Sequence, residues 1–125
     1  MLAEVAQHVL EGRAAMLDGR HRAAEKAYRR AMDAQLRARF GNDPPLFWYS
    51  ARRSLAAALL AGGDHRGARR QIEASLRRWP KDPLALYVLS LAERAAGNGE
   101  TADQTLARAR AEWAGDLASI PLTRI

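Results

Sequence analysis

The residues able to do chemistry are few in this chain of 125 residues. It has three histidines, His8, His21 and His65, and no cysteine. Without a thiol, the sequence excludes disulfides, zinc–thiolate sites, iron–sulfur ligation and cysteine nucleophiles. The histidines lack the spacing of metal ligands or of a catalytic triad, and no HExxH, GxSxG, GxGxxG or phosphate-binding glycine loop is present. We therefore expect no enzymatic activity, no cofactor and no bound metal.

Charge is the second chemical feature. The chain has 20 basic and 14 acidic residues, a net charge of +6 that suits nucleic acid or another acidic partner. Eighteen of the basic residues are arginine and alanine is abundant, a combination that GC-rich coding sequence also produces. Residues 49–82 carry +5, against +2 for residues 1–48 and −1 for residues 83–125. Both a functional basic surface and codon bias stay open.

The elements that position these residues are helices. Apolar residues recur at i, i+3 and i+4, as in residues 55–60 and 84–91, and β-branched residues are few. The Asp-Pro pairs Asp43-Pro44 and Asp82-Pro83 are typical of an N-cap followed by proline in the first turn. Glycines that end apolar runs indicate helix C-termini. The pattern predicts an all-α fold with six helices, over residues 2–17, 21–40, 45–61, 65–79, 83–96 and 99–114.

An internal repeat organises these helices. In each copy a glycine is followed five residues later by an alanine and nine residues later by a larger apolar residue. The second and third copies lie 34 residues apart, and the first precedes the second by 44. The three sets are Gly19, Ala24 and Tyr28; Gly63, Ala68 and Ile72; and Gly97, Ala102 and Leu106.

These units resemble the tetratricopeptide repeat family, whose unit is a helix–turn–helix of 34 residues. Glu11 and Glu93 depart from the family pattern, which usually has an apolar residue there. The longer first unit is similar to a longer-period variant common in bacterial proteins. Further matches are Gly12, Ala15 and Ala31 in the first unit, Leu55, Leu59, Ser75 and Pro80 in the second, and Leu86, Leu89, Ser90 and Ala109 in the third.

The resemblance implies one domain over residues 1–125, an all-α solenoid of three antiparallel helix–turn–helix units. The small alanines allow the two helices of a unit to approach closely, and the larger residue four positions on fills the space between them. The units and the irregular tail that follows them cover about residues 5–38 (with a helix extension to 40), 49–82, 83–116 and 117–125.

In this family the first helix of each unit lines a concave groove that binds extended peptides or partner helices. Arginines among apolar side chains would suit an acidic protein surface or a peptide with carboxylates and an apolar anchor, although the same arginines are also explained as solvated. A clamp for a partner's terminal carboxylate is essentially absent from the matching positions. By position, the groove residues are Val9, Arg13, Met16, Ser50, Arg53, Ala57, Leu84, Tyr87, Leu91 and Arg94.

A strip of paired arginines is the second candidate surface. Most of these pairs fall on second helices, which face outward in this family, so solvated side chains are the ordinary explanation. The alternative is a site for an acidic protein, RNA or anionic lipid, and the lack of interleaved aromatic residues weakens the nucleic-acid version. The strip consists of Arg29, Arg30, Arg52, Arg69, Arg70, Arg77 and Arg78.

The tail is the third candidate surface. Leu117, Ile120, Leu122 and Ile125 make it too apolar for a solvated segment. Stacked repeats leave apolar end faces that usually need a cover. We therefore expect the tail either to fold back over the third unit or to dock on another protein. With only three repeats, self-association of the chain is also plausible.

These observations predict a non-catalytic adaptor or accessory subunit that holds a protein partner in its groove or through its tail. The alternative is a nucleic-acid-associated regulator that uses the arginine strip, centred on the second repeat. No apolar run is long enough to span a membrane. The N-terminal residues do not form a signal peptide, so we expect a cytoplasmic protein, or a periplasmic one if a signal peptide has been removed.

Overall fold

Helices make up the regular structure of the chain. A computed structural model describes residues 2–38 and 50–125, and this part of the chain contains helices and no strand, which confirms the all-α prediction. The helices are α1 (Leu2–Leu17), α2 (His21–Ala38), α3 (Ala51–Ala61), α4 (His65–Arg78), α5 (Pro83–Ala95) and α6 (Gly99–Ala111), followed by the short 3-10 turns η1 (Leu117–Ser119) and η2 (Leu122–Arg124).

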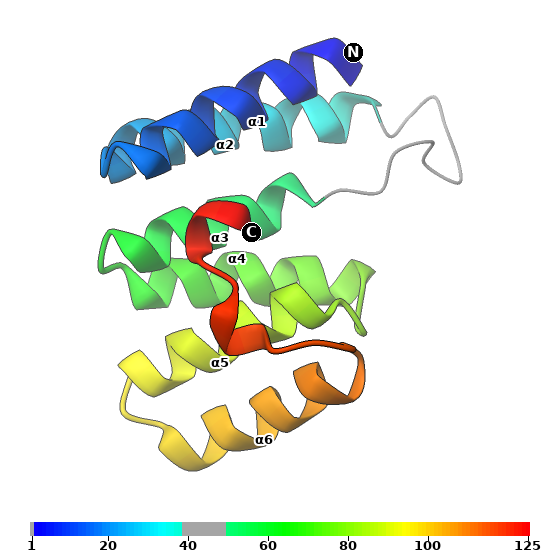
Figure 1. The fold of residues 1–125 in the computed structure, drawn as a ribbon. Helices are drawn as coiled ribbons and strands as arrows, with labels where there is room; N and C mark the ends of the chain where they lie inside the picture. Colours follow the sequence, from blue (N-terminus) through cyan, green and yellow to red (C-terminus); the bar gives the residue numbers. More distant parts are fainter. Residues whose placement is uncertain (1, 39–49) are drawn as a thin grey trace.

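The helices pack in chain order. Within the pairs α1–α2, α3–α4 and α5–α6, each helix lies against its successor, and α2–α3 and α4–α5 contacts join the pairs into one stack (Figure 1). Each helix therefore finds most of its partners close by in the sequence. The exception is the C-terminal tail, which runs back along the stack from α6 toward α3 (Figure 1).

The turn inside each pair has the same backbone geometry. Gly19, Gly63 and Gly97 have φ angles of +72°, +90° and +87°. The N–H of the residue after each glycine donates to the carbonyl five residues before it, at 2.8, 2.8 and 2.9 Å respectively. This is the Schellman motif, and only glycine adopts its positive φ without strain. The prediction that a glycine follows the end of the first helix is confirmed at all three turns.

Small residues bring the helices of a pair together. Ala24, Ala68 and Ala102 are completely buried, as their repeat positions predict. In the first pair, a Cβ built on Gly12 would lie 2.5 Å from a ring carbon of Tyr28. Tyr28 thus packs directly on the backbone of α1, and no larger residue fits at position 12.

The structure corrects several predicted helix limits. Ser50 has an extended backbone and is the N-cap of α3, so this helix begins at Ala51 rather than at residue 45. The helices α4, α5 and α6 end one to three residues earlier than predicted. The expected helix extension to residue 40 and the Asp43-Pro44 cap lie outside the described residues.

Candidate protein-interaction site

The tail lies on a face formed by α1, α3 and α5, which we call the groove face. Leu117 packs with Leu86 of α5 and Ala109 of α6 in one apolar cluster. Further along, η2 lies against α3 and α1. The tail therefore does more than cover the third helix pair, because it continues over the second pair and reaches the first (Figure 1).

Ile125 is the most deeply held residue of this segment. Its side chain is 1% exposed and belongs to the main core cluster, together with Met16 of α1, Ala57 of α3 and Val88 of α5. Its backbone oxygen accepts a hydrogen bond of 2.8 Å from the hydroxyl of Ser54, which is itself buried. The groove face thus binds an isoleucine by its side chain and by its backbone at the same time.

The other apolar residues of the tail are buried to different extents. Leu117 is buried, whereas Ile120 and Leu122 are half-buried and pack at the edge of the core. Asp116 caps η1 by accepting a hydrogen bond of 3.1 Å from the N–H of Ala118. The 3-10 turns η1 and η2 replace the irregular structure that the sequence suggested.

The predicted groove residues divide into three groups. Met16, Ser50, Arg53 and Ala57 are buried, so they form the floor of the face or lie beneath it. Arg94 is exposed and its guanidinium lies 2.6 Å from the carboxylate of Asp103 on α6. The half-buried residues, which lie between these extremes, are Val9, Arg13, Leu84, Tyr87 and Leu91.

Arg53 is the clearest correction to the predicted groove. Its guanidinium donates to the carboxylate of Asp82 at 2.8 Å, and the two side chains are 6% and 1% exposed. The second oxygen of Asp82 accepts from the N–H groups of Leu84 and Ala85 at the start of α5. Arg53 therefore ties α3 to the first turn of α5 and is not presented to a partner. Its burial follows from its place on the enclosed helix α3.

Ser50 likewise has a structural role. Its hydroxyl accepts from the N–H of Arg53 as the cap of α3 and lies 2.8 Å from the hydroxyl of Ser75 on α4. These bonds satisfy a helix end that would otherwise be buried with unpaired donors. Sequence reasoning placed this residue in the groove and missed its capping role, although Ser followed by a helical run is itself a cap signal.

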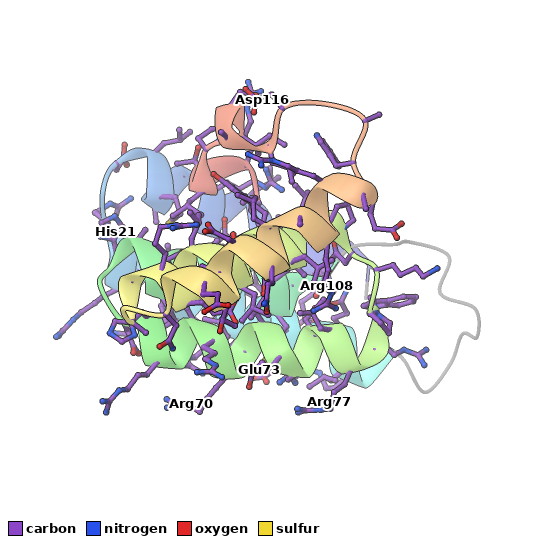
Figure 2. The ribbon with its side chains drawn as sticks, turned by 90° about the horizontal axis from the view of Figure 1, so that it is seen from below. His21, Arg70, Glu73, Arg77, Arg108 and Asp116 are labelled. Carbon is purple, nitrogen blue, oxygen red and sulfur yellow. The ribbon has the colours of Figure 1, made fainter. Side chains whose placement is uncertain are left out.

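The arginine strip lies elsewhere. Figure 2 shows Arg70 and Arg77 along α4, on the side of the molecule opposite Asp116 at the start of the tail. Arg29, Arg30, Arg69 and Arg78 are likewise exposed on α2 and α4. Arg52 is the exception, because it is half-buried on α3 and donates to the Gln71 side chain at 3.3 Å.

Some charges of the strip are neutralised locally. Arg29 pairs with Glu25 at 3.0 Å, and Arg69 pairs with Glu73 at 2.8 Å, each one helical turn apart. The hydrogen bond and the charge of Glu73 raise the pKa of Arg69 above its ordinary value. Arg78 lies over the ring of Trp79, with 5.2 Å between its guanidinium carbon and the ring centroid.

The histidines occupy the positions that the repeats predict. His21 and His65 are the first residues of α2 and α4. His8 lies on α1, where its Nδ1 is 3.1 Å from the carboxylate of Glu11. Hydrogen bonds from His8 and Gln7 hold the pKa of Glu11 below its ordinary value. Within residues 2–38 and 50–125, no cluster of three or more His, Asp or Glu side chains is placed to hold a metal ion.

Two buried polar residues were not predicted as part of the site. Ser54 binds the tail, and a serine inside an alanine-rich helix gives no signal of such a partner 71 residues away. Glu93 is 5% exposed, and its Oε1 has no hydrogen-bond partner among the residues placed in the structure. The sequence marked Glu93 only as a departure from the repeat pattern.

Comparisons with known proteins do not identify the chain. No family model matches it, and neither the curated proteins nor the solved structures contain a significant match. In the part of the chain that the structure describes, no helix is both long enough and apolar enough to cross a membrane.

Proposed function

We propose that this chain is a tetratricopeptide-type solenoid of three helix–turn–helix units that acts as a non-catalytic adaptor. Its groove face binds an extended, apolar segment of a protein partner. The chain's own tail, residues 117–125, occupies that face when no partner is present. The observation that carries this proposal is Ile125, with its side chain buried in the core and its backbone oxygen bonded to Ser54.

The chemistry of the contact supports an extended ligand. A buried aliphatic side chain contributes about 1.5–3 kcal/mol and a typical hydrogen bond about 1 kcal/mol. The face supplies one deep apolar site for Ile125, a second for Leu117 and a hydroxyl donor between the helices. A partner segment with aliphatic residues at similar spacing meets the same groups.

This proposed function combines the predicted groove and the predicted tail, which the sequence indicated as separate docking sites. The groove and the tail were alternative docking sites, whereas a tail that already lies on the groove face makes them the two halves of one site. Because Arg53 is buried against Asp82, the groove selects apolar side chains more than carboxylates. The expected partner segment is aliphatic, and the tail must leave before it binds.

A labelled peptide with the sequence of residues 116–125 tests this function. The full-length variant Leu117→Asp/Ile125→Asp should release its own tail and bind the peptide, with an affinity about tenfold above that of the unaltered chain, a difference of about 1.4 kcal/mol. A peptide carrying aspartate at the same two positions is the matched control. If the variant is folded by circular dichroism and binds neither peptide, the groove is not a peptide site.

Capture from the native source then addresses the partner. The tail-released variant should recover more of one protein than the unaltered chain does, and excess tail peptide should compete with that protein. Recovery of a second copy of the chain itself would assign the face to self-association, and recovery that the peptide does not affect would contradict the proposal.

A further inference from the structure

The positive charge of the molecule is carried by two helices. Together α2 and α4 contain ten basic and three acidic residues, a net charge of +7, so the rest of the chain carries −1. The excess therefore spans the first and second helix pairs and is not centred on the second alone. We call the outer surface of α2 and α4 the basic face.

Several cations of the basic face have no partner among the residues that the structure describes. Among the described residues, Arg22, Lys26, Arg66, Arg70 and Arg77 are exposed and form no hydrogen bond or ion pair with another described side chain. These groups stand in contrast to Arg29 and Arg69, which glutamates neutralise, and they are the ones available to an external anion.

Three exposed arginines of α4 form a row. Arg66, Arg70 and Arg77 lie at i, i+4 and i+11, which places them on one side of a helix with 3.6 residues per turn. With a rise of 1.5 Å per residue, the row is about 16 Å long. Figure 2 shows Arg70 and Arg77 projecting from the same edge of α4, away from the tail. A row of guanidinium groups suits a line of anionic oxygens, which arginine binds in a bidentate manner.

The apolar composition of this surface narrows the class of partner. Among the described residues, the exposed large apolar side chains are Leu10 and Leu17 on α1 and Leu36 on α2, so α4 presents none. Stable protein interfaces use buried aromatic or aliphatic anchors, and surface-bound membrane helices insert an apolar face. Single-stranded nucleic acids bind through stacking on exposed aromatic side chains. Tyr28 of α2 is buried, and Trp79 at the C-terminal end of α4 is half-buried with Arg78 over its ring. A regular array of phosphates needs none of these features.

We propose that the basic face binds the phosphate backbone of double-stranded nucleic acid without sequence preference. The groove face lies on the other side of the stack, so a protein segment and a duplex can bind at the same time. The proposal does not depend on the peptide-binding function, because the two faces share none of the residues that carry the arguments.

The test measures binding of the full-length chain to a labelled 20-base-pair duplex of mixed sequence, as DNA and as RNA, over a series of salt concentrations. Each phosphate contact changes the slope of log affinity against log salt by about 0.9 for DNA. The variant Arg70→Gln/Arg77→Gln should lower the slope by about 1.8 and weaken binding to all sequences alike. The matched control is Arg108→Gln/Arg110→Gln, which removes two exposed charges from α6 and should change the slope much less.

The outcomes separate the alternatives. Equal losses in the two variants would overturn the proposal, because net charge and not the basic face would then govern binding. Tighter binding to phosphatidylserine vesicles or to polyglutamate than to either duplex would overturn it in favour of a membrane or an acidic protein. A selective loss in the α4 variant on DNA, on RNA or on both would support it and would identify the kind of duplex.

Discussion

The groove face and the basic face come from alternate helices of the same helix pairs, yet residues of the same type are buried on one face and exposed on the other. In the middle pair, eight of the 11 residues of α3 are buried, against four of the 14 residues of α4. Both helices contain adjacent arginines. Arg53 is buried on α3, whereas Arg69 and Arg70 are exposed on α4. Position in the stack, more than residue type, decides what each arginine does.

Two ion pairs show how this difference in burial affects stability. The pairs Arg53–Asp82 and Arg69–Glu73 have the same N···O distance of 2.8 Å. The side chains of the first are 6% and 1% exposed, and those of the second 49% and 45%. Breaking a buried pair strands a charge away from water, whereas a solvent-exposed pair is screened and contributes less than about 1 kcal/mol. Although the two pairs have the same N···O distance, removing one partner should therefore cost much more stability in the buried pair than in the exposed one.

The largest effect is expected from the buried pair. Arg53→Ala should lower the free energy of unfolding by about 3–5 kcal/mol, because it leaves the carboxylate of Asp82 buried without its partner. Urea denaturation measures this loss. Arg69→Ala is the matched control and should cost less than about 1 kcal/mol. Similar costs for the two variants would contradict the distinction between the faces.

The tail should make the next largest contribution. Leu117→Ala should lower the free energy of unfolding by about 2 kcal/mol, at the low end for a buried leucine because a tail can detach instead of keeping a cavity. Leu122→Ala, at a half-buried position on the same segment, should cost less. Thermal or urea unfolding compares the two. Unchanged stability in the Leu117 variant would mean that the tail does not pack as described.

A smaller effect is expected from the hydroxyl that holds the tail. Ser54→Ala removes a hydrogen bond of about 1 kcal/mol and should weaken binding of the tail peptide to the tail-released variant about fivefold. Ser75→Ala is a suitable control, because Ser75 bonds to Ser50 on the side of α3 that faces α4. Equal weakening by both substitutions would show that the effect passes through general stability.

The smallest effect concerns Glu11 on α1. His8→Ala should raise the pKa of Glu11 toward its ordinary value, with Gln7 still holding it somewhat low. Because the folded-state pKa is lowered, the pair stabilises the fold above the usual titration range of glutamate and loses this effect as the pH falls through the folded pKa. A carboxyl titration by NMR measures the change. An unaltered pKa would remove His8 as its main cause.

The helices and their turns could be predicted from the sequence because their signals are local. Gly19, Gly63 and Gly97 each determine a turn by their own backbone freedom, and Asp82 caps the helix that follows it. The repeat spacing also identified the alanines that are completely buried. These features depend on residues a few positions apart, within reach of periodicity and capping rules.

The site was harder to predict because its contacts are distant in sequence. Arg53 meets Asp82 across 29 residues, and Ser54 meets Ile125 across 71. The apolar residues of the tail predicted that it would be covered. They did not predict that it would continue over the second helix pair and reach the first. The sequence predicted Asp82 only as a helix cap. In the structure, one carboxylate serves both the helix N-terminus and Arg53.

The central claim is that the tail occupies the groove face, and disulfide trapping tests it most directly. The chain has no native cysteine, so the variant Ser54→Cys/Ile125→Cys contains only the introduced pair. An intramolecular disulfide should form rapidly at low protein concentration, with little or none in the control Arg70→Cys/Ile125→Cys, whose cysteines lie on opposite faces. Equal trapping in the two variants, or only intermolecular disulfides, would contradict this claim.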